Sequence, residues 1–198
     1  MKITLKDGSV KEYDQAKSVY EIAQDISEGL ARVACAGEIN GEIVDLRTQI
    51  SDDCELNIVT ASDPEGLRVI RHTASHVLAE AVKHLFPEAK ITIGPAIDDG
   101  FYYDFDHEPF SREDLDNLEA EMKKIIKEGH EITRFTLPRA EAIKFMQEKG
   151  EPYKVELIED LPEDSEISFY DQGGFVDLCA GPHLMSTKGV KAYKLISS

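Results

Sequence analysis

The sequence has no tryptophan and only three cysteines, Cys35, Cys54 and Cys179, among its 198 residues. An odd, widely spaced set of cysteines does not read as a disulfide framework, and it fits a reducing compartment. The chain also lacks a run of about 18 apolar residues, so we expect no membrane span and no membrane partner. Its start, MKITLKDGSV, has no apolar signal-peptide core, and a cytoplasmic location is therefore expected.

Basic residues are scarce as well, with 22 Lys and Arg against 39 Asp and Glu and a net charge of −17. Phosphate binding relies on Lys and Arg, so this balance argues against a general DNA- or RNA-binding module. It leaves open an RNA substrate that is held mainly by another part of a larger protein. The hydrophobic share of 41% is enough for a packed core, and the length allows one large domain or two modest ones.

The first 61 residues alternate between strand and helix signals. Two alternating stretches around an Asp-Gly turn predict a hairpin, and Ser18 with Glu21 forms a capping-box pattern at the start of a helix that Gly29 is expected to end. Two short strands around EINGE and a last strand at 54–60 follow. This order predicts a small ubiquitin-like β-grasp domain over residues 1–61.

The stretch ASDPEG marks a predicted boundary, and residues 62–198 are expected to form a second, two-layer α+β domain. The predicted helices are about 64–86, one after the cap Ser111, and 138–150; the predicted strands are two within 90–106 with a turn at 98–100, then 130–137, 153–158, 166–172, 174–179 and 191–196. The fold class is therefore α+β.

Two histidines, His72 and His76, stand one turn apart on the same face of the long predicted helix. At 100° per residue, this face lies opposite the apolar stripe that begins at Ile70. Either both histidines are solvated, or a second element covers them and forms a cleft. The motif of zinc peptidases requires a Glu directly after the first histidine, and Thr73 stands there, so the peptidase interpretation fails.

A second candidate group lies about a hundred residues downstream, in FVDLCAGPHL. Pro182 makes a regular helix improbable, so we expect a strand that runs into a turn. Asp177 and Cys179 would share one face of the strand, with His183 nearby. Such a set could bind zinc, could position and activate a water, or could be a buried thiol beside a surface imidazole.

Four stretches together are similar to a known family: IRHTASHVLAEAV, IGPAIDDGFYYDFD, YKVELI and FVDLCAGPH, in this order. They resemble the editing domain of threonyl- and alanyl-tRNA synthetases, and the first 61 residues resemble a TGS domain. This domain order is that of the N-terminal part of bacterial threonyl-tRNA synthetases, and the resemblance covers essentially the whole chain. It implies a piece of a longer ATP-dependent ligase of protein biosynthesis, since there is no sequence left for a class II aminoacylation core or an anticodon-binding domain.

The resemblance implies hydrolysis of seryl-tRNA for threonine by attack of water on the aminoacyl ester. Serine is threonine minus a methyl group, and one methyl group is worth only about 1–3 kcal/mol of discrimination in a pocket. A second site that is too small for threonine can correct the resulting errors. The implied partner is the acceptor end of tRNA(Thr) carrying serine, and the whole enzyme would dimerise through the domains that are absent here.

The resemblance also assigns roles to residues. His72 would handle the proton of the water or of the terminal ribose hydroxyl, and Lys154 would hold the water or the developing negative charge. Asp177 would bind the substrate amino group. The remaining pocket residues would be His76, Cys179, His183, Gly94, Tyr102 and Tyr103, of which the tyrosines would stack on the terminal adenine or close the pocket.

The sequence also leads to expectations about bound metal and about two rival functions. Alanyl-type relatives bind zinc at the positions of His72, His76, Cys179 and His183, whereas the threonyl-type site resembles a metal-free version, which we expect here. ATP and a further zinc ion are expected only in the missing catalytic core. The rival functions are a zinc-dependent trans-editing deacylase of the alanyl type, which the TGS-like start disfavours, and a regulatory binding module without catalysis.

Overall fold

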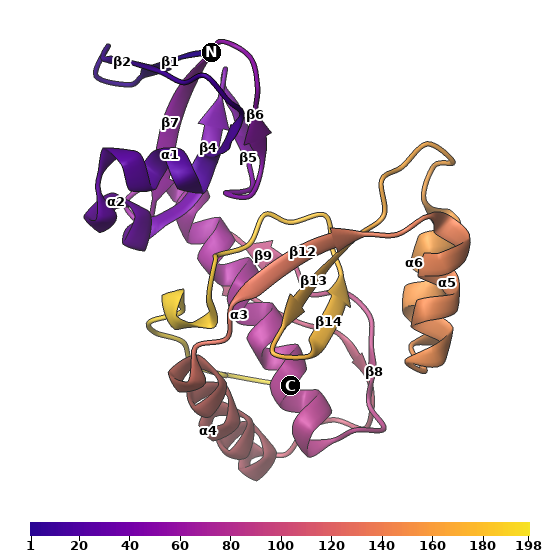
Figure 1. Ribbon diagram of the computed structural model, residues 1–198. Coiled ribbons are helices and arrows are strands. Elements are labelled where there is room, and N and C mark those ends of the chain that lie inside the picture. The colour runs from indigo at the N-terminus through magenta and orange to yellow at the C-terminus, as the bar shows by residue number, and fades with distance from the viewer. The chain divides into compact units, whose positions relative to one another are not determined.

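A computed structural model describes residues 1–198 (Figure 1). The chain divides into two compact units, one of residues 1–70 with 181–185, the other of residues 71–180 with 186–198. Both units combine helices and strands, so the predicted α+β class is confirmed. None of the helices has the length and apolar character that a bilayer crossing demands.

The first unit is built on a five-stranded sheet in the order β2-β1-β7-β4-β5. Its strands are β1 (Lys2–Leu5), β2 (Val10–Glu12), β4 (Ala34–Ile39), β5 (Glu42–Val44) and β7 (Cys54–Thr60), beside a small pair of β3 (Lys17–Ser18) and β6 (Gln49–Ile50). β1 and β7 run parallel, and the other pairs run antiparallel. This is the predicted β-grasp arrangement, with Asn40 and Gly41 at positive φ in the predicted tight turn.

Helix α1 (Val19–Ile26) packs on this sheet, and Ser18 and Glu21 make both hydrogen bonds of the predicted capping box. The predicted stop at Gly29 is wrong. The helix already ends at Ile26, and Ser27 caps a second short helix, α2 (Glu28–Val33), by accepting from the backbone N–H of Leu30. Ser27 ends the first helix and caps the second. The second helix is so short that its apolar residues do not form a recognisable helical period in the sequence.

The second unit contains four α-helices and one short 3-10 helix: α3 (Pro64–Leu85, which begins in the first unit), α4 (Arg112–Glu128), α5 (Arg139–Glu148), α6 (Pro152–Asp160) and η1 (Thr187–Gly189). The predicted strand at 153–158 is wrong, because these residues form α6. Pro152 occupies the first helical turn, where its fixed φ and missing N–H are tolerated. The predicted strand at 191–196 is also absent.

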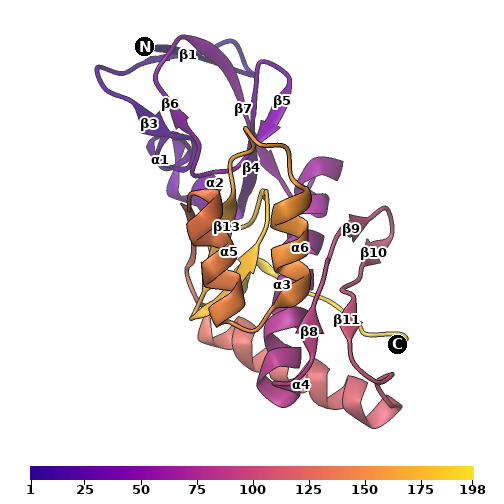
Figure 2. The same ribbon diagram turned by 90° about the vertical axis from the view of Figure 1, so that its right-hand side faces the viewer.

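A three-stranded antiparallel sheet, β12-β13-β14, lies at the centre of this unit (Ile132–Thr136, Ser168–Gln172 and Phe175–Leu178). Helices α5 and α6 lie side by side (Figure 2) and pack on the sheet through a cluster that includes Met146, Ile158 and Phe169. Gln172 of β13 donates to Glu80 of α3 at 2.7 Å. The sheet therefore links α3 to the α5–α6 pair. Asp177 of β14 lies between α3 and α6.

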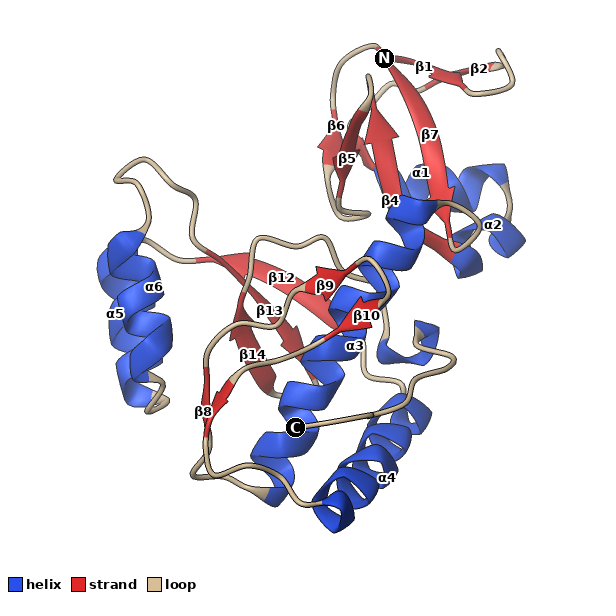
Figure 3. Ribbon diagram, turned by 180° about the vertical axis from the view of Figure 1, so that it is seen from behind, coloured by secondary structure: helices blue, strands red, loops and turns tan.

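Residues 90–106 form two short antiparallel ladders rather than two plain strands (Figure 3): β8 (Lys90–Ile91) pairs with β11 (Phe105–Asp106), and β9 (Ala96–Ile97) pairs with β10 (Gly100–Phe101). The predicted turn at 98–100 joins β9 to β10. Gly94 lies between the ladders, and a Cβ atom there would come within 2.1 Å of the Tyr103 ring. The missing side chain thus lets Tyr103 pack against the backbone.

Candidate functional site

Helix α3 is covered along its middle, where residues 73–82 are all buried. His76 is 3% exposed and His72 is half-buried. The two rings stand edge to face, with centroids 5.1 Å apart. The histidines are therefore not solvated surface residues, and the alternative of a covered helix face is the correct one.

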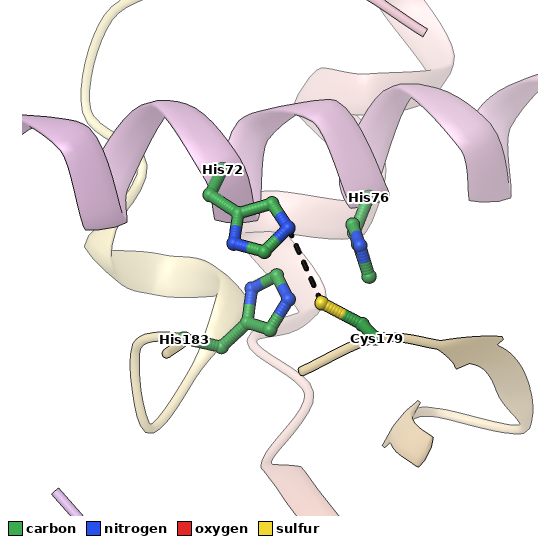
Figure 4. A group of neighbouring side chains, drawn as sticks. All are labelled: His72, His76, Cys179 and His183. Carbon is green, nitrogen blue, oxygen red and sulfur yellow. Dashed lines mark hydrogen bonds between the residues drawn. The ribbon is translucent and has the colours of Figure 1, made fainter. Parts of the chain in front are cut away.

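Cys179 follows the last residue of β14 and is held by Ser168 of β13. Its backbone N–H donates to the Ser168 carbonyl at 3.1 Å, and the Ser168 hydroxyl donates to the Cys179 carbonyl at 2.6 Å. In this position its Sγ lies 3.3 Å from Nε2 of His72 (Figure 4). Sequence reasoning missed Ser168, because nothing in a strand sequence marks the hydroxyl that will fix a residue on the neighbouring strand.

Four candidate residues form one cluster. One ligand atom each from His72, His76, Cys179 and His183 lies within 4.8 Å of all the others, as Figure 4 illustrates. Imidazole and thiolate are the donors that zinc prefers. Bonds of about 2.0–2.3 Å in a tetrahedron would require the outermost donors to approach one another more closely. The donor set fits zinc in chemistry, and a small contraction would complete the geometry.

Asp177 of β14 is the centre of a second, buried group. Its Oδ1 forms an ion pair with Nζ of Lys154 at 2.7 Å, and its Oδ2 accepts from the Tyr103 hydroxyl at 2.6 Å. Nε2 of His76 lies 3.5 Å from the same Oδ2. Asp177 is 1% exposed and Lys154 is 2% exposed. The predicted residues on α3, α6, β14 and the 90–106 segment thus come together at one carboxylate.

Burial and charge set the protonation states of this group. Burial lowers the pKa of His76 to about 3, although the nearby Asp177 charge opposes the shift. Burial alone would raise the pKa of Asp177, but Lys154, His76 and the Tyr103 hydroxyl outweigh it and hold this pKa below its usual value. Burial and the Asp177 charge raise the pKa of Tyr103. At neutral pH, His76 and Tyr103 are neutral and Asp177 is a carboxylate.

Tyr102 and Tyr103 play different parts. Tyr103 is 7% exposed and turns its hydroxyl to Asp177, whereas Tyr102 is 40% exposed. Both line a groove of about 510 Å³ that also includes Phe101, Phe105 and Phe110. Gly94 contributes through its close approach to the Tyr103 ring. An aromatic groove of this kind borders the Asp177 group through Tyr103.

Comparison with known proteins first defines the class of the two parts. Residues 1–60 match the TGS domain, and residues 167–198 match the threonyl and alanyl tRNA synthetase second additional domain. The second match includes Asp177, Cys179 and His183.

Whole-chain relatives then narrow the similarity. All 198 residues match threonine–tRNA ligases, with 64% identity to that of Acetivibrio thermocellus, 60% to that of Caldanaerobacter subterraneus subsp. tengcongensis and 58% to that of Clostridioides difficile. Over its whole length the chain is therefore similar to threonine–tRNA ligases. It spans about a third (31%) of the length of these curated relatives.

Proposed function

We propose that this chain is the editing part of a threonine–tRNA ligase and hydrolyses seryl-tRNA(Thr) by attack of water on the aminoacyl ester. The observation that carries the proposal is the convergence of a half-buried imidazole and thiol, His72 and Cys179, with the buried Lys154–Asp177 pair. Ester hydrolysis needs a proton acceptor for the water and a positive charge or donors for the developing oxyanion. This group of residues supplies both.

His72 is the proposed proton acceptor for the water or for the terminal ribose hydroxyl. It is more exposed than His76, so a water or a ribose can reach it. Imidazole is the side chain that most often serves as a general acid or base. His76, with its pKa lowered to about 3, is a poor proton carrier near neutral pH and is proposed to line the pocket with Cys179 and His183.

Lys154 and Asp177 are the proposed charged pair of the reaction. Lys154 would stabilise the developing negative charge, and Asp177 would receive the ammonium group of serine. Both Asp177 oxygens already have partners, so a substrate ammonium would share the carboxylate with Lys154 and Tyr103. Substrate binding would then free part of the Lys154 charge for the ester.

Selectivity for serine over threonine is proposed to be steric. The His76 ring and the Tyr103 hydroxyl lie within 3.5 Å of Oδ2 of Asp177, and the Cys179 thiol lies beside His72. We expect an additional methyl group to overlap with one of these groups. The groove beside Tyr102 and Tyr103 is the proposed seat of the terminal adenine, because aromatic rings offer stacking faces to any base. The proposed location is cytoplasmic.

We propose that editing needs no metal. The support is that His72 and the Lys154–Asp177 pair supply a proton acceptor and a positive charge for the ester reaction without a metal ion. Metal analysis of protein purified without chelator tests this point. One zinc per chain that is lost in His72→Ala would overturn it and would favour the zinc-dependent type of site.

The deciding experiment incubates the chain with seryl- and threonyl-tRNA for threonine and with seryl-tRNA for alanine. Only the first should be cleared quickly, and His72→Ala or Lys154→Met should abolish most of the clearance. Lys144→Met is the matched control, because the Lys144 side chain is 76% exposed on α5. Clearance of seryl-tRNA for alanine instead would favour the alanyl type, and no clearance of any ester at high protein concentration would favour a binding module.

A further inference from the structure

The β-grasp domain contains a charged pair that is held on both sides. Asp45 follows β5, and Arg47 lies two residues further on. Nη1 of Arg47 lies 3.0 and 3.2 Å from the two carboxylate oxygens of Asp45, whose Oδ1 also accepts from the Arg47 backbone N–H at 2.8 Å. The two side chains are only 11% and 16% exposed, so this is not a loose surface pair.

The pair holds a segment that is distant in sequence. Arg47 donates from Nη1 to the carbonyl of His183 at 3.2 Å and from Nη2 to the carbonyl of Leu184 at 2.8 Å. Oδ2 of Asp45 accepts from the backbone N–H of His183 at 3.1 Å. Both backbone groups of His183 are thereby bound by one ion pair, and residues 181–185 belong to the same compact unit as the pair.

This arrangement matters because segment 181–185 has no strand or helix to fix it. Backbone groups of such a segment need partners from elsewhere, and charged partners make the stronger hydrogen bonds. Met185 adds an apolar contact with the β-grasp core. His183 itself is 1% exposed, so a displaced backbone would have to move a buried ring.

We propose that Asp45 and Arg47 are positioning residues for His183, a residue of the proposed editing pocket, because they fix its backbone. The inference rests on the proposed function for its effect on rate. Neither residue is assigned a contact with substrate. Arginine is required because two successive carbonyls are bound by the two ends of one planar guanidinium, which the single ammonium of lysine cannot reproduce.

A double-mutant cycle in the 198-residue chain tests the proposal. Arg47→Met should slow clearance of seryl-tRNA(Thr) by about 10-fold or more, which is the loss of roughly one charged hydrogen bond. Arg47→Lys should recover less than half of the lost rate. In a His183→Ala background, Arg47→Met should cause little further loss of rate, because the proposed effect of Arg47 on clearance passes through the position of the His183 ring. Independent, multiplied effects would overturn the proposal.

The control is Lys17→Met, which breaks another ion pair of the same domain, Lys17–Asp25. It should leave clearance unchanged. Urea unfolding of every variant separates lost positioning from lost folding. An Arg47→Met protein whose rate loss only matches its unfolded fraction would count against the proposal.

A readout without activity separates this inference from the proposed function. In Asp45→Ala, hydrogen exchange of the His183 amide, followed by NMR, should accelerate about 10-fold or more, since its acceptor is removed. The amides of Phe169 and Tyr170 in β13 should be unchanged. If the parent chain clears no ester but this acceleration occurs, the proposed function fails and the positioning survives. Unchanged exchange at His183 would refute the positioning in either case.

Discussion

Asp177 illustrates how much of the site depends on a single buried charge. A carboxylate with 1% exposure is costly unless it is paired, and Lys154 is the paired cation. Removing one member of such a pair leaves the other charge buried without compensation. Under the proposed function, loss of ester clearance in a variant of either residue therefore has two alternative causes, a missing chemical group or a damaged fold.

We predict that Asp177→Asn and Lys154→Met each destabilise the protein by about 3–5 kcal/mol, and that the double variant loses clearly less than the sum. The reason is that the double variant leaves no unpaired charge. Urea unfolding at pH 7 measures all three. Glu148→Gln, in the exposed pair with Lys144, is the control and should change nothing measurable. Additive losses would contradict the prediction.

The buried Glu80 leads to a prediction about how the stability of the fold depends on pH. It is 1% exposed, and burial raises its pKa although the hydrogen bond from Gln172 opposes the shift. The folded protein therefore retains the Glu80 proton to higher pH than the unfolded chain does, and stability falls as pH rises through that window. Nε2 of His84 lies 3.7 Å from Oε1 of Glu80, and the charges of His130 and Glu128 also act on this carboxyl group.

Glu80→Gln keeps an oxygen for Gln172 and removes the buried charge. It should be more stable than the parent at pH 7, and the difference should vanish near pH 3, well below the ordinary Glu pKa of about 4.3, where the parent carboxyl is protonated in both states. Urea unfolding at both pH values provides the measurement. A gain of equal size at both values would show that packing, not ionisation, is responsible.

At the scale of elements, α6 is anchored through the residue before it. Glu151 is 4% exposed; its Oε1 pairs with Nζ of Lys83 at 2.7 Å, and its Oε2 accepts from the N–H of Ile91 at 3.1 Å. Lys83 also donates to the carbonyls of Pro87 and Ala89. These contacts join the end of α3, β8 and the start of α6, which carries Lys154.

We predict that Glu151→Ala costs about 3 kcal/mol, because it leaves the partly buried Lys83 charge and the Ile91 N–H without this acceptor. Glu151→Gln should recover part of the loss through its amide oxygen. Thermal or urea unfolding measures the cost, with Glu148→Ala on the exposed face of α5 as control. An effect no larger than that of the control would refute the role of the anchor.

The sequence predicted elements well where local signals were strong. The Ser18–Glu21 and Ser111 caps and the Asn40–Gly41 turn set their elements by contacts within a few residues, and all are present. The strand predicted around Lys154 was wrong because six residues are too few to distinguish the apolar period of a helix from that of a strand. Tertiary contacts favour a helix there.

The same limit applies to the site. Helical spacing placed His72 and His76 together on a face away from the apolar stripe, and that prediction was confirmed. The links from Tyr103 and Lys154 to Asp177 span 74 and 23 residues of chain. Family resemblance placed the three residues in one pocket, but neither it nor spacing predicted these contacts. No local pattern marks Asp45 and Arg47, whose partners lie 136–138 residues away.

At the scale of the whole molecule, the net charge and the length of the chain both bear on where tRNA would bind. The chain has a net charge of −17 and spans 31% of its relatives. Phosphate binding requires basic side chains, so under the proposed function most of the affinity for tRNA should reside in the part of a full-length ligase that these 198 residues do not represent. The chain would then contribute chemistry and selectivity, while another part contributes binding.

This division predicts how editing depends on concentration and salt. Single-turnover clearance by the chain should rise in proportion to protein concentration without a plateau up to about 10 µM, since even non-specific tRNA binding by basic proteins falls in the range of about 1–100 µM. The full-length ligase of Acetivibrio thermocellus should reach its plateau at far lower concentration. Raising salt from 50 to 200 mM should weaken the full-length enzyme more than the chain, because fewer phosphate contacts release fewer counterions. Equal saturation and equal salt dependence would place the tRNA contacts within these 198 residues, despite their acidic composition.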